Sequence, residues 1–337
     1  MADLTTKFMG ITIKNPVIAG ASSLTADIET IKELERHNAG AIVIKSLFEE
    51  QIQLEKYKFD EELHKNDERY AEMTSLHPPI EHAGPKEHLI WVKKATEKVD
   101  IPVIASLNAN NFETWIEYAK ELEKTGVHGL ELNFYKIPEN FNVSGEEIEN
   151  NQIKILNAIK KKVSIPISIK LSPSYTNTLN IVKKMDEIGV NGFVLFNRFF
   201  QPDIDVYKEE HVYPFNLSRE NDYRLSLRYS GLLYDKINAD ICASRGVFEG
   251  YDVIKLLLAG ANCAQTVSAL YKKRIKYLDE IIADIKSWME EKNYKSIEEF
   301  RGKLSEKNVD DRYTYKRAQY VDLLMNPENL DINEPLV

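Results

Sequence analysis

Eight short runs of apolar and β-branched residues recur along the chain, and helical sequence separates most of them. The runs cover residues 16–19, 41–45, 102–106, 129–133, 166–170, 192–196, 240–243 and 263–267. They are almost continuously hydrophobic, which is typical of strands that are covered on both faces of a parallel sheet. Strands that alternate with helices build right-handed β–α–β units. This pattern restricts the chain to the α/β class.

The segments between these runs carry the spacing of amphipathic helices. An apolar stripe follows one face of residues 112–122 and consists of Phe112, Trp115, Ile116, Ala119 and Leu122. The same spacing predicts helices over residues 27–39, 146–162, 177–188, 249–259 and 272–290. Ser296 followed by Glu299 is a capping-box pattern and predicts one more helix near the end of the chain.

A count of eight strands favours a closed TIM (β/α)8 barrel over an open doubly wound sheet. No Gly-x-Gly-x-x-Gly motif follows any of these strands, which weakens the dinucleotide-binding alternative. We expect the barrel to occupy residues 1–305. Residues 306–337 are polar and are expected to pack on the barrel as a C-terminal extension.

Two connections are too long to be simple turns between a strand and the next helix. They span residues 46 to about 90 and residues 197 to about 225, and the second is strand-like and Tyr-rich around 206–215. Long ordered loops usually serve function. Both leave the carboxyl end of a strand, so we expect them over the barrel mouth, where they can form a lid.

Composition and charge limit the classes of partner. The chain has 44 Lys and Arg against 53 Asp and Glu, a net charge of −9, which argues against nucleic acid or a membrane surface. Cys242 and Cys263 lie in apolar runs and are expected to be buried thiols. The N-terminus lacks a signal-peptide pattern and no apolar run approaches 18 residues, so we expect a cytoplasmic protein. The clustered histidines lack ligand spacing and predict no metal site: His77, His82 and His88.

Polar residues gather at the carboxyl ends of the predicted strands, where barrel enzymes place their chemistry. In chain order they are Gly20-Ala21-Ser22, Lys45-Ser46, Asn108, Asn133, Lys170 and Asn197. Two lysines in the mouth of an acidic protein need anionic partners, for which a ligand carboxylate, phosphate or electron-rich ring is suited. Amides both donate and accept, which suits a ring with alternating N–H and C=O groups. Lysines that extend to solvent and asparagines that cap the backbone are the structural alternatives.

Mostly small residues stand at the carboxyl ends of the last two predicted strands. They are Ser244-Arg245-Gly246 and Val267-Ser268, and Ser230-Gly231 lies between the sixth and seventh strands. Barrels often bind phosphate through the loops after strands seven and eight, using backbone N–H groups. Arg245 by itself would also suit a surface charge.

In this order, the motifs resemble those of the class 1 dihydroorotate dehydrogenase family over roughly residues 4–305. The first strand, with Asn15-Pro16 and Gly20-Ala21-Ser22, resembles the flavin-contacting strand of that family, and residues 41–46 resemble its lysine-bearing strand. Further similar segments are Glu131-Leu132-Asn133, Lys170-Leu171-Ser172-Pro173, Tyr229-Ser230-Gly231, and residues 260–271 and 296–302.

The resemblance implies FMN as cofactor and hydride transfer from a CH–CH donor, dihydroorotate or a related anionic ring, as in pyrimidine biosynthesis. It implies that Lys170 stabilises negative charge at the N1–C2=O edge of reduced flavin, and that Lys45 lies between flavin and substrate. Asn133 and Asn197 would hold the substrate ring. The implied cofactor contacts are Gly20, Ala21, Lys45, Ser46, Asn108, Asn133, Lys170, Gly231, Ser244, Arg245, Gly246, Val267 and Ser268. A homodimer is also implied.

The sequence departs from the family on the substrate side. After Asn133 the family has Leu-Ser-Cys-Pro-Asn or a close relative, in which Cys or Ser is the general base, whereas this chain has Phe134-Tyr135-Lys136-Ile137-Pro138-Glu139. Tyr135 and Lys136 are the candidate replacements as catalytic base. The orotate-binding loop Asn-Ser-Met-Gly-Leu is altered to Ala71-Glu72-Met73-Thr74-Ser75.

The phosphate side departs as well, because Arg245 and Val267 stand where the family prefers glycine. Two alternative functions therefore stay open. A catalytically inactive FMN-binding paralogue with a regulatory or partner role would fit the missing base. A Schiff-base lyase would fit a strand-end lysine, provided that Lys45 or Lys170 is desolvated and unpaired.

Overall fold

The structure is a computed structural model that describes residues 2–52, 85–137, 140–214, 217–310 and 312–316, with Val321, Leu324 and Met325. Its barrel strands are β3 Val17–Ala19, β4 Ala41–Val43, β6 Val103–Asn108, β7 Gly129–Phe134, β8 Ile167–Leu171, β9 Gly192–Leu195, β12 Asp240–Ala243 and β13 Cys263–Thr266. The hydrogen-bonded order is β4-β3-β13-β12-β9-β8-β7-β6, and β6 pairs back to β4. All these pairings are parallel. The predicted TIM barrel and its eight predicted strands are confirmed.

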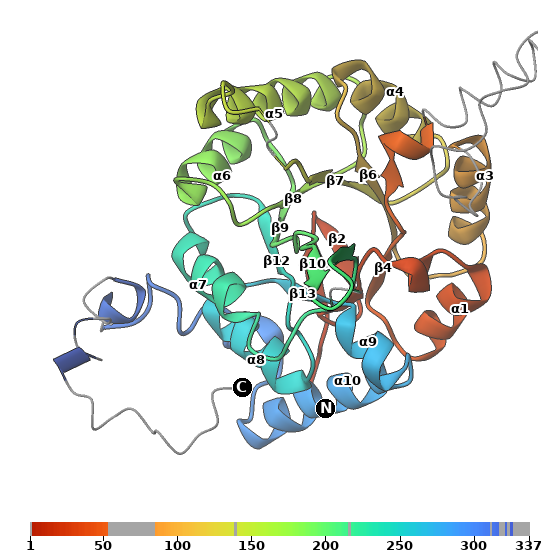
Figure 1. Cartoon of the computed structure of the whole chain (residues 1–337). Coiled ribbons are helices and arrows are strands. Elements are labelled where there is room, and N and C mark those ends of the chain that lie inside the picture. The colour runs from red at the N-terminus through yellow and green to blue at the C-terminus, as the bar shows by residue number, and fades with distance from the viewer. Residues whose placement is uncertain are drawn as a thin grey trace, which may run out of the picture.

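Helices form a ring around these strands (Figure 1). They are α1 Ile28–Arg36, α3 Pro85–Thr96, α4 Phe112–Glu123, α5 Gly145–Lys160, α6 Thr178–Glu187, α7 Arg224–Leu233, α8 Gly250–Ala259, α9 Ser268–Lys273 and α10 Tyr277–Glu291. Side-chain caps fix several starts: Asp27, Asn111 and Ser144 each accept a backbone N–H from the first turn of α1, α4 and α5. The predicted helices at 27–39, 112–122, 146–162, 177–188 and 249–259 are confirmed to within a few residues.

Two helical predictions are wrong. Residues 272–290 do not form one helix, because Arg274 between α9 and α10 has a φ of 70°, a left-handed conformation that ends a right-handed helix. Ser296 does not start an α-helix either; the segment makes a single 3-10 turn, η2 Ile297–Glu299. The Glu299 carboxylate accepts the N–H of Lys295, and the Ser296 side chain makes no cap bond, so the capping box does not form.

A hairpin that the sequence analysis did not predict closes the N-terminal end of the barrel. It consists of β1 Thr6–Phe8 and β2 Ile11–Ile13, which pair antiparallel. Phe8 and Met9 are each 1% exposed. A Cβ on Gly192, the first residue of β9, would lie 2.8 Å from Phe8 Cε2, and one on Gly129, the first residue of β7, would lie 2.7 Å from Met9 Cε. The hairpin therefore plugs this end, and the open mouth is at the other.

Apolar residues form two cores. The larger core lies between the strands and the helices and includes Trp115, Leu156 and Ile285. The smaller core fills the lower barrel interior with Phe8, Met9, Ile13, Ile18, Ala41, Val43, Ile104, Val194, Cys242 and Cys263. Both cysteines are free and buried, as predicted. The buried residues toward the carboxyl ends are instead polar, and this change along the barrel axis creates the site.

The described part of the second long connection contains a hairpin, β10 Asp203–Asp205 and β11 Glu210–Val212, which confirms strand-like sequence but places it about three residues earlier than predicted. The first long connection is described as far as Ile52 and again from Pro85. Its first described part contains β5 Leu47–Phe48, which pairs with β6. The altered loop at residues 71–75 lies outside the described residues. After residue 305, Tyr315 packs on α7, and its carbonyl accepts from Arg228 Nη2 at 2.8 Å.

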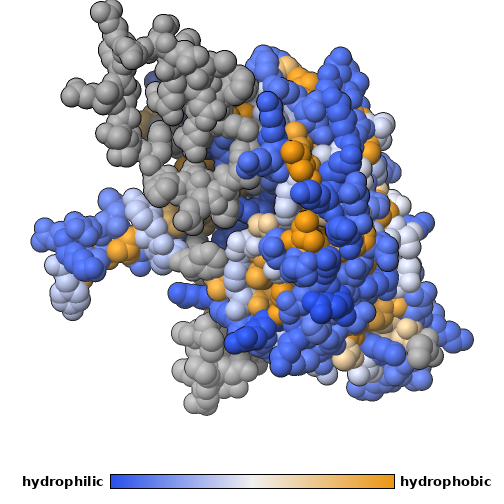
Figure 2. All heavy atoms as spheres, turned by 90° about the vertical axis from the view of Figure 1, so that its right-hand side faces the viewer, coloured by the Kyte–Doolittle hydropathy of each residue, from blue (hydrophilic) through white to orange (hydrophobic). Residues whose placement is uncertain are grey.

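The side of the molecule that carries α3 is mostly hydrophilic, with hydrophobic residues in small separate groups (Figure 2). Every helix in the described part of the chain is too short or too polar to cross a bilayer. On this side the helices thus present mainly polar residues to the outside, as their sequence spacing predicts.

We expect Phe8→Ala to lower the free energy of unfolding by about 3–5 kcal/mol, because it empties a fully packed position in the plug. Urea unfolding followed by circular dichroism measures this change. Phe141→Ala is the matched control, since Phe141 is fully exposed and should shift the midpoint little. Equal effects of the two substitutions would contradict the assignment of the hairpin as a structural plug.

Candidate functional site

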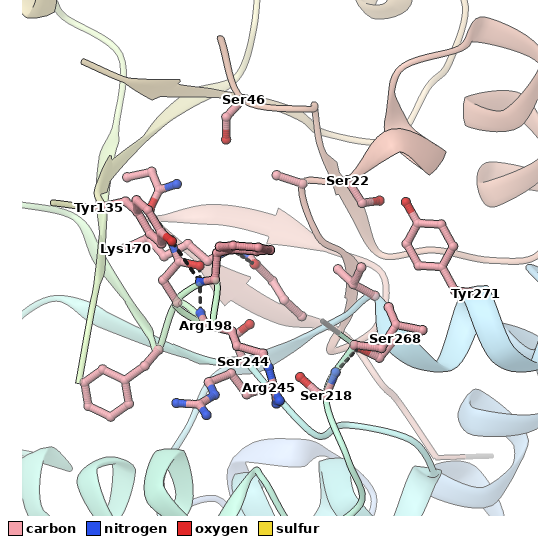
Figure 3. A pocket seen from close by; sticks show the side chains of 18 of the residues that line it. Ser22, Ser46, Tyr135, Lys170, Arg198, Ser218, Ser244, Arg245, Ser268 and Tyr271 are labelled. Carbon is pink, nitrogen blue, oxygen red and sulfur yellow. Dashed lines mark hydrogen bonds between the residues drawn. The ribbon is translucent and has the colours of Figure 1, made fainter. Parts of the chain in front are cut away.

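A pocket of about 680 Å³ opens at the carboxyl ends of the barrel strands. Figure 3 shows side chains that converge on it from strand ends all round the barrel. The predicted residues that line it are Ala21, Lys45, Ser46, Asn133, Tyr135, Lys170, Asn197, Ser244, Arg245, Gly246, Val267 and Ser268. The structure thus brings together residues that lie up to 247 positions apart in the chain, from Ala21 to Ser268.

Four predicted site residues do not line this pocket. Gly20 lies behind the wall, where a Cβ would be 2.8 Å from Val267 Cγ2. Asn108 is structural, because its Nδ2 donates to the Asn133 carbonyl at 2.8 Å. Lys136 lines a neighbouring cavity with Asn108. Gly231 lies within α7, where the missing side chain makes room for the Tyr315 ring, so a cofactor contact through Gly231 finds no support in the fold.

Three buried polar side chains interact at the floor of the pocket. Lys170 Nζ donates to Gln265 Oε1 at 3.1 Å and lies 3.5 Å from Glu131 Oε1, and Gln265 Nε2 donates to Glu131 Oε2 at 2.6 Å. Lys170 and Gln265 line the pocket, whereas Glu131 lies beneath it. The fold therefore supplies a carboxylate as one anionic partner of Lys170, and the prediction that a ligand group is another stays a prediction. A charged residue inside an apolar strand was the available signal for Glu131.

Two amide side chains form a second group. Asn197 Nδ2 donates to Asn133 Oδ1 at 2.6 Å, and Asn197 Oδ1 accepts from the Arg198 backbone at 2.7 Å. These bonds fix which end of each amide faces which partner. Asn133 Nδ2 makes no hydrogen bond within the described part of the chain, so it is available to donate into the pocket.

Lys45 lies in the wall of the pocket, on the segment that follows β4. Burial lowers the pKa of its ammonium group. Burial also lowers the pKa of His88, and the positive charge of Lys45 lowers it further, to about 4. His88 is therefore neutral near pH 7, and its buried Nε2 has no hydrogen-bond partner among the described residues. The sequence showed His88 only as part of a histidine cluster, and its proximity to Lys45 appears only in the fold.

Two arginines lie near the turn that follows β12. Arg198 pairs with Asp222. Burial lowers the pKa of Arg245, the Asp222 carboxylate opposes that shift, and the Arg198 charge adds to it. Arg245 and Gly246 have φ values of 79° and 63°, and a Cβ on Gly246 would lie 2.6 Å from the Tyr223 nitrogen. The turn is therefore tight, and only glycine fits at its second position.

Tyr135 links the pocket to the segment that follows β9. Its Oη accepts the backbone N–H of Phe200 at 2.8 Å, and its ring packs edge-on against Phe199 at 5.0 Å between centroids. Ser46, which also lines the pocket, hydrogen-bonds the buried Ser106 at 2.7 Å. Sequence reasoning missed Ser106 of β6, because strand residues that face the interior cannot be told from those that face the helices when a strand is apolar on both sides. It also missed Arg198, which lies in the connection after β9 and belongs to none of the motifs at the strand ends.

The fold and the pocket define a (β/α)8-barrel enzyme with a cationic, amide-lined site at the strand ends. A sequence profile of the family described as Dihydroorotate dehydrogenase matches residues 80–289. The catalytic subunit of dihydroorotate dehydrogenase B (NAD(+)) from Thermoplasma volcanium is 28% identical over 310 residues, which cover 90% of this chain and 98% of the relative. The corresponding subunit from Methanocaldococcus jannaschii is 25% identical over 90% of this chain and 98% of its own length.

A putative dihydroorotate dehydrogenase A (fumarate) from Aeropyrum pernix is 27% identical over 225 residues, 65% of this chain and 72% of the relative. The chain belongs to the dihydroorotate dehydrogenase family, in its class 1 branch. It is an FMN-binding oxidoreductase of that type, which confirms the predicted family, cofactor and class of activity.

We expect Tyr135→Phe to speed hydrogen exchange in residues 197–214 about fivefold, because one neutral hydrogen bond contributes about 1 kcal/mol. Exchange followed by mass spectrometry measures the effect. Tyr213→Phe is the control: the Tyr213 ring stacks on Phe200, and its hydroxyl makes no hydrogen bond within the described residues. Unchanged exchange in Tyr135→Phe would show that this hydrogen bond does not hold the segment.

Proposed function

We propose that this chain oxidises dihydroorotate, or a closely related anionic ring, at a CH–CH bond and delivers the hydride to FMN in the pocket at the barrel mouth. The observation that carries the proposal is the placement of Lys170 and the Asn133–Asn197 pair on one cavity. A cation at the floor suits a flavin that gains negative charge, and paired amides suit a ring of alternating donors and acceptors.

The residues present fit FMN. Lys170 is 8% exposed at the pocket floor, a position from which it would face the N1–C2=O edge of the isoalloxazine. The Ser244-Arg245-Gly246 turn and Val267-Ser268 line the same pocket after the last two strands, where barrels commonly hold phosphate. The buried Arg245 Nε has no hydrogen-bond partner among the described residues, and a phosphate oxygen would satisfy it. FMN, when bound, supplies the hydride acceptor.

On the substrate side, this chain offers donors and a cation. Asn133 Oδ1 already accepts a hydrogen bond from Asn197 Nδ2. The Asn133 side chain therefore has its N–H groups left for a ligand, and they would donate to a ring carbonyl. The Lys45 ammonium would face the carboxylate of the substrate. This donor-rich lining is the physical reason to propose an anionic small molecule as substrate.

Proton removal from the substrate carbon needs a base, and no cysteine or serine stands at the family position. Of the two predicted candidates, Tyr135 lines the pocket and Lys136 does not. The Phe200 N–H donates to Tyr135 Oη and would support negative charge on that oxygen. We therefore propose Tyr135, and not Lys136, as the general base.

A Schiff-base lyase needs an unpaired neutral lysine, and Lys170 does not provide one, because it contacts both Glu131 and Gln265. Lys45 has no such partner among the described residues, and for Lys45 the family match favours flavin chemistry over a lyase. We further propose that the chain acts as a homodimer in the cytoplasm. The two unpaired thiols, Cys242 and Cys263, suit a reducing compartment. The names of the relatives specify NAD(+) or fumarate, and these two compounds are the electron acceptors to assay first.

We expect excess dihydroorotate, added anaerobically to the FMN-loaded protein, to bleach the flavin absorption near ~450 nm. Tyr135→Phe should slow bleaching about 100-fold or more, the usual contribution of a general base, while Lys136→Ala should change it only slightly. FMN that binds but stays oxidised would contradict dihydroorotate oxidation and leave the inactive paralogue. A slow Lys136→Ala variant beside a normal Tyr135→Phe variant would reverse the assignment of the base.

We expect the affinity for orotate to fall as pH rises through the lowered pKa of Lys45, because the ammonium that faces the carboxylate loses its proton. The decline should begin below the ordinary lysine value of 10.5. Titration of the flavin spectrum with orotate at several pH values measures it. Lys45→Met should bind weakly with no such decline, and a decline that persists in this variant would assign it to another group.

A further inference from the structure

We propose that Glu131 is the counter-ion of Lys170 and sets how much positive charge the pocket floor presents to the flavin. The inference rests on the proposed function, because it assumes that the isoalloxazine lies over Lys170. It concerns a residue that neither contacts the substrate nor lines the pocket. Glu131 is therefore a positioning and charge-setting residue rather than a catalytic one.

The barrel places Glu131 directly beneath the site. Glu131 and Asn133 are two positions apart on β7, so their side chains point to the same, interior face. In the parallel register Asn133 pairs with Lys170 of β8. Glu131 pairs with Ser168, two residues nearer the N-terminal end of the barrel. One strand thus supplies an amide that faces the pocket and, below it, the carboxylate that contacts Lys170.

The three residues form a closed triangle that is almost entirely buried. Lys170, Gln265 and Glu131 are 8%, 2% and 1% exposed. Gln265 donates to Glu131 and accepts from Lys170, so both ends of its amide are fixed, and Gly20 packs against the amide, since a Cβ there would lie 3.2 Å from Gln265 Oε1. Glu131 Oε1 has no hydrogen-bond donor among the described residues other than the nearby ammonium as an ion pair. The carboxylate is oriented toward Lys170 by Gln265.

The charges of Lys170 and Glu131 sum to zero, and this limits the net electrostatic attraction that a flavin above them would feel. Charges interact strongly in a buried site, because little solvent screens them. Negative charge that develops at the N1–C2=O edge is attracted by Lys170 and repelled by Glu131. Glu131 therefore makes the flavin harder to reduce than an unpaired lysine would, and it keeps the buried ammonium compensated when no ligand is present.

Sulfite affinity of the oxidised, FMN-loaded protein tests this without substrate turnover. Sulfite donates its lone pair to flavin N5, and the electron pair displaced from the ring leaves negative charge over N1 and the C2 carbonyl. The dissociation constant, read from the loss of the ~450 nm band, therefore reports the charge at that edge. We expect Glu131→Gln to bind sulfite about tenfold more tightly, Lys170→Met to bind it about tenfold more weakly, and the flavin midpoint potential to follow the same order.

Glu131→Gln leaves a buried lysine unpaired and can fail to fold. The double variant Glu131→Gln/Lys170→Met keeps the test decisive. It replaces an ion pair, whose net charge is zero, by two uncharged side chains, so it leaves no buried charge unpaired. Its sulfite affinity should lie within about threefold of that of the unaltered protein, well above that of Lys170→Met. The control is Asp186→Asn, which also removes one buried carboxylate, but at the opposite face of the barrel, where Asp186 accepts from Asn238 and Ala239.

Three results would overturn the inference, and they differ from failure of the proposed function. The first is unchanged sulfite affinity in folded Glu131→Gln. The second is a double variant that binds as weakly as Lys170→Met, which would mean that Glu131 does not cancel the lysine charge. The third is an equal shift in Asp186→Asn, which would indicate net charge alone. FMN that fails to bind the unaltered chain would overturn the proposed function itself, and with it this inference.

Discussion

Closure of the parallel sheet between β4 and β6 is the constraint on which the rest of the structure depends. Ile42 pairs with Val103 and Val43 with Ile104, and these contacts join the two ends of the strand order into a ring. Because every barrel strand is parallel, closure brings all the carboxyl ends to one rim. Residues such as Lys45 and Ser268, far apart in sequence, then share one cavity.

The barrel interior is apolar at its N-terminal end and polar toward the mouth. The apolar end stabilises the fold, and the polar end forms the candidate site. The β1–β2 hairpin fills the N-terminal end with apolar side chains such as Phe8 and Met9. Toward the mouth the interior holds Lys170, Glu131 and Gln265, whose burial is tolerated because each satisfies another. The apolar plug excludes water from below, which strengthens the electrostatic interactions above it.

The sequence predicted the strands well and several local features poorly, for identifiable reasons. The apolar runs were long enough to mark all eight barrel strands. The break at Arg274 was invisible, because a non-glycine residue with positive φ carries no sequence signal. The capping-box pattern at Ser296 had the right residues, yet the Glu299 carboxylate accepts the N–H of Lys295, so a competing local hydrogen bond takes the place of the capping box. Gly231 belonged to a matching motif, but the Tyr315 ring occupies the space beside it.

The sequence alone determined the fold class, the family and the set of polar residues at the strand ends, because periodicity and motif order are local properties of the chain. Only the tertiary structure decided which of these residues meet. It joined Lys170 of β8 to Glu131 of β7 and Gln265 of β13, and it placed Tyr135 in the pocket and Lys136 outside it. These relations depend on strand register and on which face of a doubly buried strand points inward, and an uninterrupted apolar run does not encode that choice.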